Sequence, residues 1–165
     1  MAKPKAQTMQ QKMGFMDSDL GTQKHDEIML WLDANIEAVI ESITGNKAEV
    51  ENKIWEYPIV QRGGYGNTSK FVIGFIDLVA ISSIENRFKG QIRNACFEVK
   101  SSIPSLGELI RQIKMYETYI HHEHFFVVVS PDARFADALR SQGIEFYHYA
   151  PDGADAAMMR QDERP

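Results

Sequence analysis

Apolar residues recur with helical spacing in two long segments of the chain. Between residues 26 and 43 they stand at Ile28, Leu32, Ile36, Val39, Ile40 and Ile43. Positions three or four apart lie on one face of an α-helix, and Gly45 supplies a stop signal. A second helix is predicted to begin at Ser105, because Ser105 and Glu108 have the spacing of a capping box. Its apolar stripe consists of Leu106, Leu109, Ile110, Ile113 and Ile120.

Five other segments have the short apolar or alternating patterns of β-strands. They are residues 53–61, 70–82, 94–101, 125–129 and 144–149. The turn-rich residues 62–68 join the first two strands as a hairpin. A short helix, starting at Asp132 and ending at Gly143, is predicted between the last two strands. The order α-β-β-β-α-β-α-β predicts an α/β fold with a mixed β-sheet flanked by helices.

Three ionisable side chains interrupt two strongly apolar strands. Asp77 lies within Phe-Val-Ile-Gly-Phe-Ile-Asp-Leu-Val-Ala, and Glu98 and Lys100 lie within Ala-Cys-Phe-Glu-Val-Lys. A buried charge is costly unless it is paired or binds a metal. Because residues two apart on a strand share a face, Glu98 and Lys100 are expected to point the same way. The pattern indicates a metal site that cleaves phosphodiesters. The alternative is a Glu/Lys pair on an exposed edge strand.

An Asp on the second strand followed by Glu-x-Lys on the third resembles the PD-(D/E)xK nuclease superfamily, whose core is restriction-endonuclease-like. The resemblance extends over about residues 26–149. It implies that Asp77 and Glu98 bind one or two Mg²⁺ (or Mn²⁺) ions, and that Lys100 orients or activates the attacking water. The chain departs from the family motif at Ile76, where the motif has Pro.

Gln112 and Tyr116 resemble the Gln-x-x-x-Tyr motif that follows Glu-x-Lys in RecB-like nucleases. Side chains four apart lie on the same face of a helix. The resemblance implies catalytic support from both: Gln112 would donate to a phosphate or bind a water at the metal, and Tyr116 would pack against the DNA backbone. The alternative is a surface Gln beside a half-buried Tyr.

Two further acids are candidate metal ligands. Members of the family often add an acidic residue from the first helix, for which Glu27 is the best candidate. Glu56 lies on the first strand and is expected to supply a ligand or to support one. Alternatively, Glu27 stabilises the helix dipole and Glu56 faces solvent. Cys96, the single cysteine, is expected to be a small buried core residue rather than a nucleophile.

Length and composition are those of one globular domain. The chain has 165 residues, of which 44% are hydrophobic, enough to bury a core. Residues 25–150 are expected to form the domain, between a flexible N-terminal segment at residues 1–24 and a flexible tail at 151–165. No apolar run approaches the ~20 residues of a membrane span, and the start lacks the apolar stretch of a secretory signal. We therefore expect a cytoplasmic protein without membrane contact.

These features predict a Mg²⁺-dependent deoxyribonuclease. The net charge of −5 argues against indiscriminate polyanion binding, so DNA must be contacted by local basic groups. Arg62 and Lys70, beside Tyr65 in the hairpin, are candidates. Exonuclease and endonuclease activity both remain open, and a junction-cutting endonuclease would favour a homodimer. The alternative function is a nucleic-acid- or protein-binding regulator that retains the nuclease fold without catalysis.

Overall fold

The computed structural model describes residues 23–64, 66, 69–85 and 90–150. The predicted flexible tail at residues 151–165 lies outside this part of the chain. So does the predicted flexible N-terminal segment at residues 1–24, apart from its last two residues. The elements are α2 (Gln23–Thr44), β1 (Ala48–Arg62), β2 (Lys70–Glu85), β3 (Gly90–Val99), α3 (Leu106–Glu117), β4 (His124–Ser130), the 3₁₀ turn η1 (Ala133–Phe135), α4 (Ala136–Ser141) and β5 (Glu145–His148). They follow one another in the predicted order.

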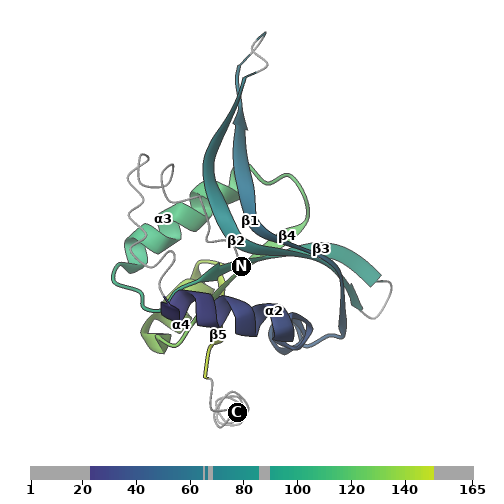
Figure 1. The fold of residues 1–165 in the computed structure, drawn as a ribbon, viewed down its shortest axis with the longest axis vertical. Helices are drawn as coiled ribbons and strands as arrows, with labels where there is room; N and C mark the ends of the chain where they lie inside the picture. Colours follow the sequence, from purple (N-terminus) through teal and green to yellow (C-terminus); the bar gives the residue numbers. More distant parts are fainter. Residues whose placement is uncertain (1–22, 65, 67–68, 86–89, 151–165) are drawn as a thin grey trace.

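The strands form one mixed sheet in the order β1-β2-β3-β4-β5 (Figure 1). β1 pairs with β2, and β2 with β3, in antiparallel orientation. β3 pairs with β4, and β4 with β5, in parallel orientation. Each parallel pair is connected through a helix, α3 for the first and η1 with α4 for the second, as a parallel crossover requires. The prediction of an α/β fold with a mixed sheet flanked by helices is confirmed.

Helices cover both faces of the sheet. The apolar stripe of α2 packs on one face against Phe97 of β3 and Val127 of β4. On the other face, α3 and α4 pack against Cys96 and Phe126, the neighbouring positions on the same two strands. β3 and β4 are therefore buried on both sides, which explains why their sequences are nearly continuous apolar runs.

The first helix owes its length to its regular apolar stripe and its end to Gly45. Within its 22 residues, the side chains Ile28, Met29, Leu32, Ile36, Val39 and Ile40 are buried and form one stripe with three- to four-residue spacing. Gly45 has a φ of +70°, a conformation that costs glycine little, and its N–H donates to Glu41 O at 2.8 Å. Within the described residues, no helix is long and apolar enough to cross a membrane.

β1 is longer than its sequence pattern indicates. It starts at Ala48 rather than at residue 53. The Ala48 N–H donates to the Glu41 carboxylate at 3.1 Å, and the Val50 N–H donates to the Glu37 carboxylate at 3.0 Å. Because two side chains of α2 accept these backbone hydrogen bonds at the sheet edge, the extension depends on packing between elements. Residues 48–52 therefore join the strand without an alternating apolar pattern of their own.

The β1–β2 hairpin extends well beyond the body of the molecule (Figure 1). We call its outer part the arm, formed by Ile59–Arg62 of β1 and Lys70–Gly74 of β2. The Gly63 N–H donates to Ser69 O at 2.8 Å beyond the last strand pair. Tyr65, one of the predicted DNA-contacting residues, lies outside the described residues.

Candidate active site

The Glu-x-Lys pair lies at the end of β3. Glu98 is 1% exposed and Lys100 is 6% exposed, and Lys100 Nζ lies 3.5 Å from Glu98 Oε2. The Lys100 N–H donates to Val129 O at 3.0 Å, which extends the pairing of β3 with β4 by one residue. The two side chains lie together, as the two-residue period predicts. The alternative of an exposed edge strand is wrong, because β3 lies between β2 and β4.

Asp77 lies on the neighbouring strand β2, level with Glu98. Leu78 pairs with Phe97, so Asp77 and Glu98 are the next residues along the same antiparallel register. Asp77 is 7% exposed, and its Oδ2 accepts a hydrogen bond from the Val99 N–H at 2.8 Å. A carboxylate oxygen thereby takes the place of a backbone acceptor at the point where the β2–β3 ladder ends.

The two-residue period of the strands predicts that Asp77 and Glu98 share one face of the sheet. Val79 and Cys96 are paired two residues further into the ladder, and both belong to the apolar cluster under α3. Positions two apart on a strand share a face, so Asp77 follows Val79 and Glu98 follows Cys96. The common face is the condition for these two carboxyl groups to act on one ion. Cys96 itself is a buried core residue, as predicted.

The first turn of α2 brings to the site a histidine, His25, that was not among the residues predicted from the sequence. His25 is 3% exposed. Its Nε2 lies 3.5 Å from Asp77 Oδ2, and its Nδ1 lies 3.7 Å from Asp26 Oδ1. The signal was present in the spacing, since His25 precedes Ile28 by three residues and so extends the apolar stripe of α2 by one turn.

The surroundings of Asp77 keep its carboxyl group ionised. Burial raises the pKa of Asp77, but the adjacent His25 ring, the Lys100 amine and the Val99 N–H together lower it further, so that it lies below its ordinary value. Asp77 is therefore an anion at neutral pH despite its low exposure. A cation can bind to it without first displacing a proton.

Glu56 lies on β1 beside Asp77. The neighbouring residues Trp55 and Tyr57 pair with Leu78 and Ile76, which leaves Glu56 level with Asp77. Burial and the charge of Asp77 raise the pKa of Glu56, against the opposing effect of His25. Glu56 also has a φ of +51°, a conformation that costs a non-glycine residue free energy and is concentrated at functional sites.

Glu27 is placed differently from the other predicted ligands. It is exposed, and its carboxylate lies 3.8 Å from Lys24 Nζ and accepts a hydrogen bond from Gln23 at 3.3 Å. Its described contacts are thus within the first turn of α2. Of the residues in that turn, His25 is the one in contact with Asp77.

Gln112 and Tyr116 are both on the buried face of α3, at 5% and 0% exposure. Gln112 Nε2 donates to Tyr116 Oη at 3.0 Å. The alternative of a surface Gln and a half-buried Tyr is therefore wrong. The Tyr116 ring packs so closely on Gly74 of β2 that a Cβ at Gly74 would lie 2.6 Å from Tyr116 Oη. The motif thus links α3 to the base of the arm.

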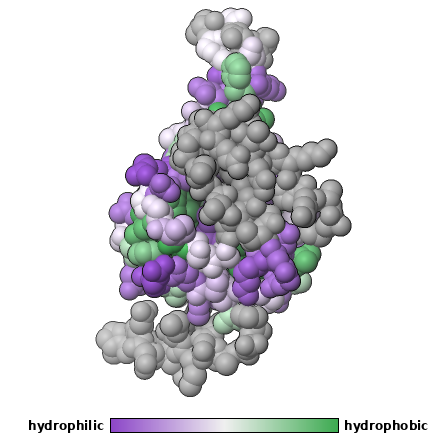
Figure 2. Space-filling view, turned by 60° about the vertical axis from the view of Figure 1, so that its left-hand side comes forward, coloured by the Kyte–Doolittle hydropathy of each residue, from purple (hydrophilic) through white to green (hydrophobic). Residues whose placement is uncertain are grey.

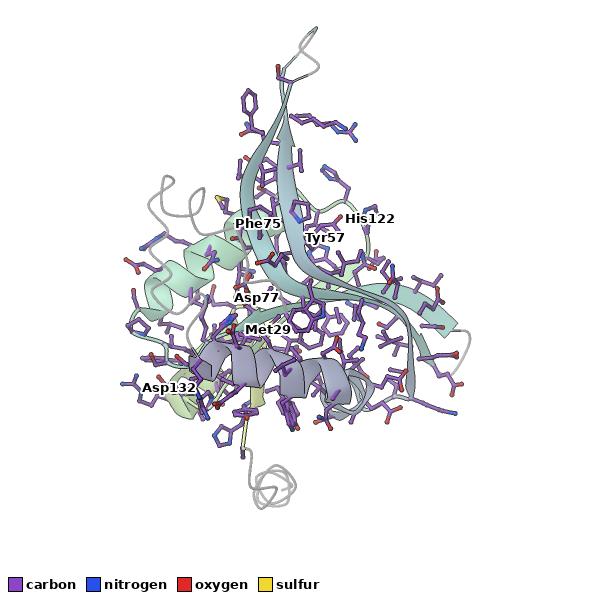
Figure 3. All side chains as sticks on the ribbon, viewed as in Figure 1. Met29, Tyr57, Phe75, Asp77, His122 and Asp132 are labelled. Atoms are coloured by element: carbon purple, nitrogen blue, oxygen red, sulfur yellow. The ribbon has the colours of Figure 1, made fainter. Side chains whose placement is uncertain are left out.

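The donor set suits a hard divalent cation. Figure 3 shows Asp77 where the hairpin strands reach α2, with Tyr57 and Phe75 further along the hairpin. Among the described residues, no three His, Cys, Asp or Glu side chains are already grouped as a metal site. Mg²⁺, however, is usually held by one or two carboxylates together with waters and substrate phosphates. Asp77 and Glu98 are two buried carboxyl groups of the type that such an ion uses.

In comparisons with known proteins, no family model, no curated protein and no solved structure matches the chain.

Proposed function

We propose that this protein is a metal-dependent nuclease that hydrolyses DNA phosphodiester bonds at a PD-(D/E)xK site. One observation carries the proposal: Asp77 and Glu98 lie opposite each other on buried strands, and the Lys100 amine lies 3.5 Å from Glu98. Buried charged groups are weak contributors to stability and are often replaceable by apolar residues with a gain. Their presence in an otherwise apolar sheet favours a catalytic use.

The order of the elements supports a restriction-endonuclease-like core. Three antiparallel strands are followed by a crossover through α3 to a parallel strand. Asp77 stands on the second strand, Glu98 and Lys100 stand at the end of the third, and Gln112 and Tyr116 follow on the crossover helix. This order supports the parts that the family resemblance implies for Asp77, Glu98, Lys100 and Gln112. The Tyr116 ring, at 0% exposure, instead packs within the core and is not placed to contact a DNA backbone.

Each residue has a defined part in the proposed reaction. Asp77 and Glu98 would hold Mg²⁺ or Mn²⁺, with His25 or Glu56 as a further ligand. When bound, the cation supplies Lewis acidity at the phosphoryl oxygen and lowers the pKa of the attacking water. Lys100 stabilises the negative charge that develops on the phosphate oxygens. An imidazole ligand would favour Mn²⁺ over Mg²⁺, since nitrogen donors suit the transition metal better.

The test is cleavage of supercoiled plasmid and of end-labelled linear DNA. Cleavage is expected with Mg²⁺ or Mn²⁺ and not with EDTA. Glu98→Gln and Lys100→Met should each reduce the rate by at least about 10²–10³-fold, the loss typical of removing one electrostatic contact to the transition state. A comparison of the cleavage of linear DNA with blocked ends and with free ends then distinguishes exonuclease from endonuclease activity.

Exposed residues of the same types provide matched controls. Glu49→Gln changes an exposed Glu at the start of β1, and Lys47→Met changes an exposed Lys just before it; both variants should cleave as the wild type does. Circular dichroism and a melting curve check that the Glu98 and Lys100 variants remain folded. Undiminished cleavage by folded Glu98→Gln and Lys100→Met proteins would refute the site.

A second candidate function is a non-catalytic regulator that binds nucleic acid or protein through the same fold. The net charge of −5 favours its protein-binding form, because an acidic protein repels a polyanion such as DNA. Such a regulator would bind its partner equally well with Glu98→Gln or Lys100→Met, and would show no metal-dependent cleavage.

A further inference from the structure

The arm carries positive charge without any negative charge. Residues 57–76 include Arg62 and Lys70 but no Asp or Glu, although the whole chain has 23 acidic residues and a net charge of −5. Arg62 and Lys70 pair with each other across the two strands, and both are exposed. Against an acidic body, a basic extension complements a polyanion, and each phosphate contact by such groups adds salt-sensitive affinity.

An exposed aromatic side chain follows the basic pair on β2 and projects from the opposite face of the arm, because neighbouring residues of a strand point to opposite faces. Phe71 is 53% exposed and pairs with Gln61. Figure 2 shows the arm standing clear of the body, with hydrophilic and hydrophobic residues adjoining on its stem. A single exposed apolar residue is ordinary on a protein surface. Proteins that bind single-stranded nucleic acid, however, combine basic groups that contact the backbone with exposed rings on which the bases stack.

The base of the arm is joined to the proposed active site. Gly74 packs on the buried Tyr116 ring of α3, and β2 runs on from Gly74 to Asp77. Phe71 and Asp77 are six residues apart on this strand, which at ~3.3 Å per residue is about 20 Å. One DNA strand has a phosphate about every 3.4 Å along the helix axis, so this length corresponds to about six nucleotides.

We propose that the arm holds the DNA about six nucleotides away from the phosphate that occupies the active site. Arg62 and Lys70 contact phosphates, and Phe71 stacks on a base. The inference rests on the proposed nuclease function and adds to it a preference for DNA long enough to reach from Asp77 to the arm.

The test measures DNA binding without cleavage, by fluorescence anisotropy of Glu98→Gln protein in EDTA. Labelled oligonucleotides of about 5 and about 25 nucleotides are used, both single-stranded and as duplexes. Arg62→Ala/Lys70→Ala and Phe71→Ser should each weaken binding of the long DNA about tenfold or more and leave the short DNA unaffected. For single strands, two lost phosphate contacts should reduce the slope of log K against log salt by about 1.4. Matched controls are Lys47→Ala, at an exposed lysine, and Ile92→Ser, at an apolar strand residue that is 60% exposed.

Each outcome assigns the failure to one proposal or the other. A loss of binding by the arm variants that is confined to the long DNA, whether single-stranded or duplex, supports the proposed role of the arm. If the wild type cleaves DNA but the arm variants bind long DNA within twofold of the two controls, the arm inference is overturned and the nuclease stands. If the wild type neither binds nor cleaves DNA, the nuclease proposal fails and the arm inference fails with it.

Discussion

Replacing Gly74 by Ala tests the contact between the arm and the Gln-x-x-x-Tyr motif. The added Cβ would lie 2.6 Å from Oη, 2.7 Å from Cε1 and 3.0 Å from Cζ of Tyr116, whereas carbon atoms in contact are about 3.5–4.0 Å apart. The ring is 0% exposed, and its hydroxyl is held by Gln112 at 3.0 Å. It cannot move aside without disturbing the core or breaking that hydrogen bond.

The expected cost follows from these contacts. Overpacking of a core costs about 1–3 kcal/mol, and the reduced entropy of the unfolded chain with Ala offsets about 0.4–1 kcal/mol of it. The free energy of unfolding should therefore fall by about 1–2 kcal/mol, which lowers the Tm by roughly 3–8 °C for a domain of this size. Urea denaturation and differential scanning calorimetry measure the two quantities.

Two further variants make the measurement specific to this contact. Gly64→Ala is the control, because a Cβ at Gly64 would meet nothing within 4 Å, and it should not destabilise the protein. In a Tyr116→Phe background the hydroxyl contact is gone while the ring contacts remain. Gly74→Ala should then cost about 0.5–1 kcal/mol less, as a double-mutant cycle reports for residues in contact. A Gly74→Ala protein as stable as the wild type would refute the close packing of Tyr116 on β2.

Three other predictions concern stability and reactivity. Asp132→Ala should lower the free energy of unfolding by about 1 kcal/mol at pH 7, because its carboxylate caps η1 and bonds Arg134 at 2.7 Å. Hydrogen bonds from Arg134 hold the pKa of Asp132 well below its usual value. The contribution of Asp132 to the free energy of unfolding is therefore complete above the ordinary carboxyl pKa, about 3.9, and is lost as the pH falls further. If the difference in stability between the wild type and Asp132→Ala grew towards pH 2, this expectation would be contradicted. Glu98→Gln and Lys100→Met should each destabilise the protein, because each change removes one member of a buried pair that is 3.5 Å apart. The double variant should lose less free energy of unfolding than the two single variants added together. Additive losses in urea denaturation would argue against this coupling. The Cys96 thiol should not react with a disulfide reagent at pH 8 until denaturant is added, since burial and then the charge of Glu98 raise its pKa to about 12, and rapid native-state labelling would show that the β3 core opens.

Local patterns were enough to predict the elements and part of the site. The three-to-four-residue spacing in α2, the cap at Ser105 whose Oγ accepts from the Glu108 N–H at 3.4 Å, and the shared face of Glu98 and Lys100 all follow from the geometry of a single segment. Helix and strand periods are properties of the backbone, so they can be read without knowing what the segment packs against.

Only the tertiary structure decided how these segments meet. Asp77 is level with Glu98 because β2 and β3 pair in one of several possible registers. His25 reaches Asp77 because α2 crosses the sheet where it does, and Glu56 lies beside them in a left-handed conformation that no local pattern of β1 indicates. Registers and helix placements are selected by the burial of apolar faces over the whole domain. The chain alone therefore determines the residue types available for chemistry, and long-range packing determines which of them share a site.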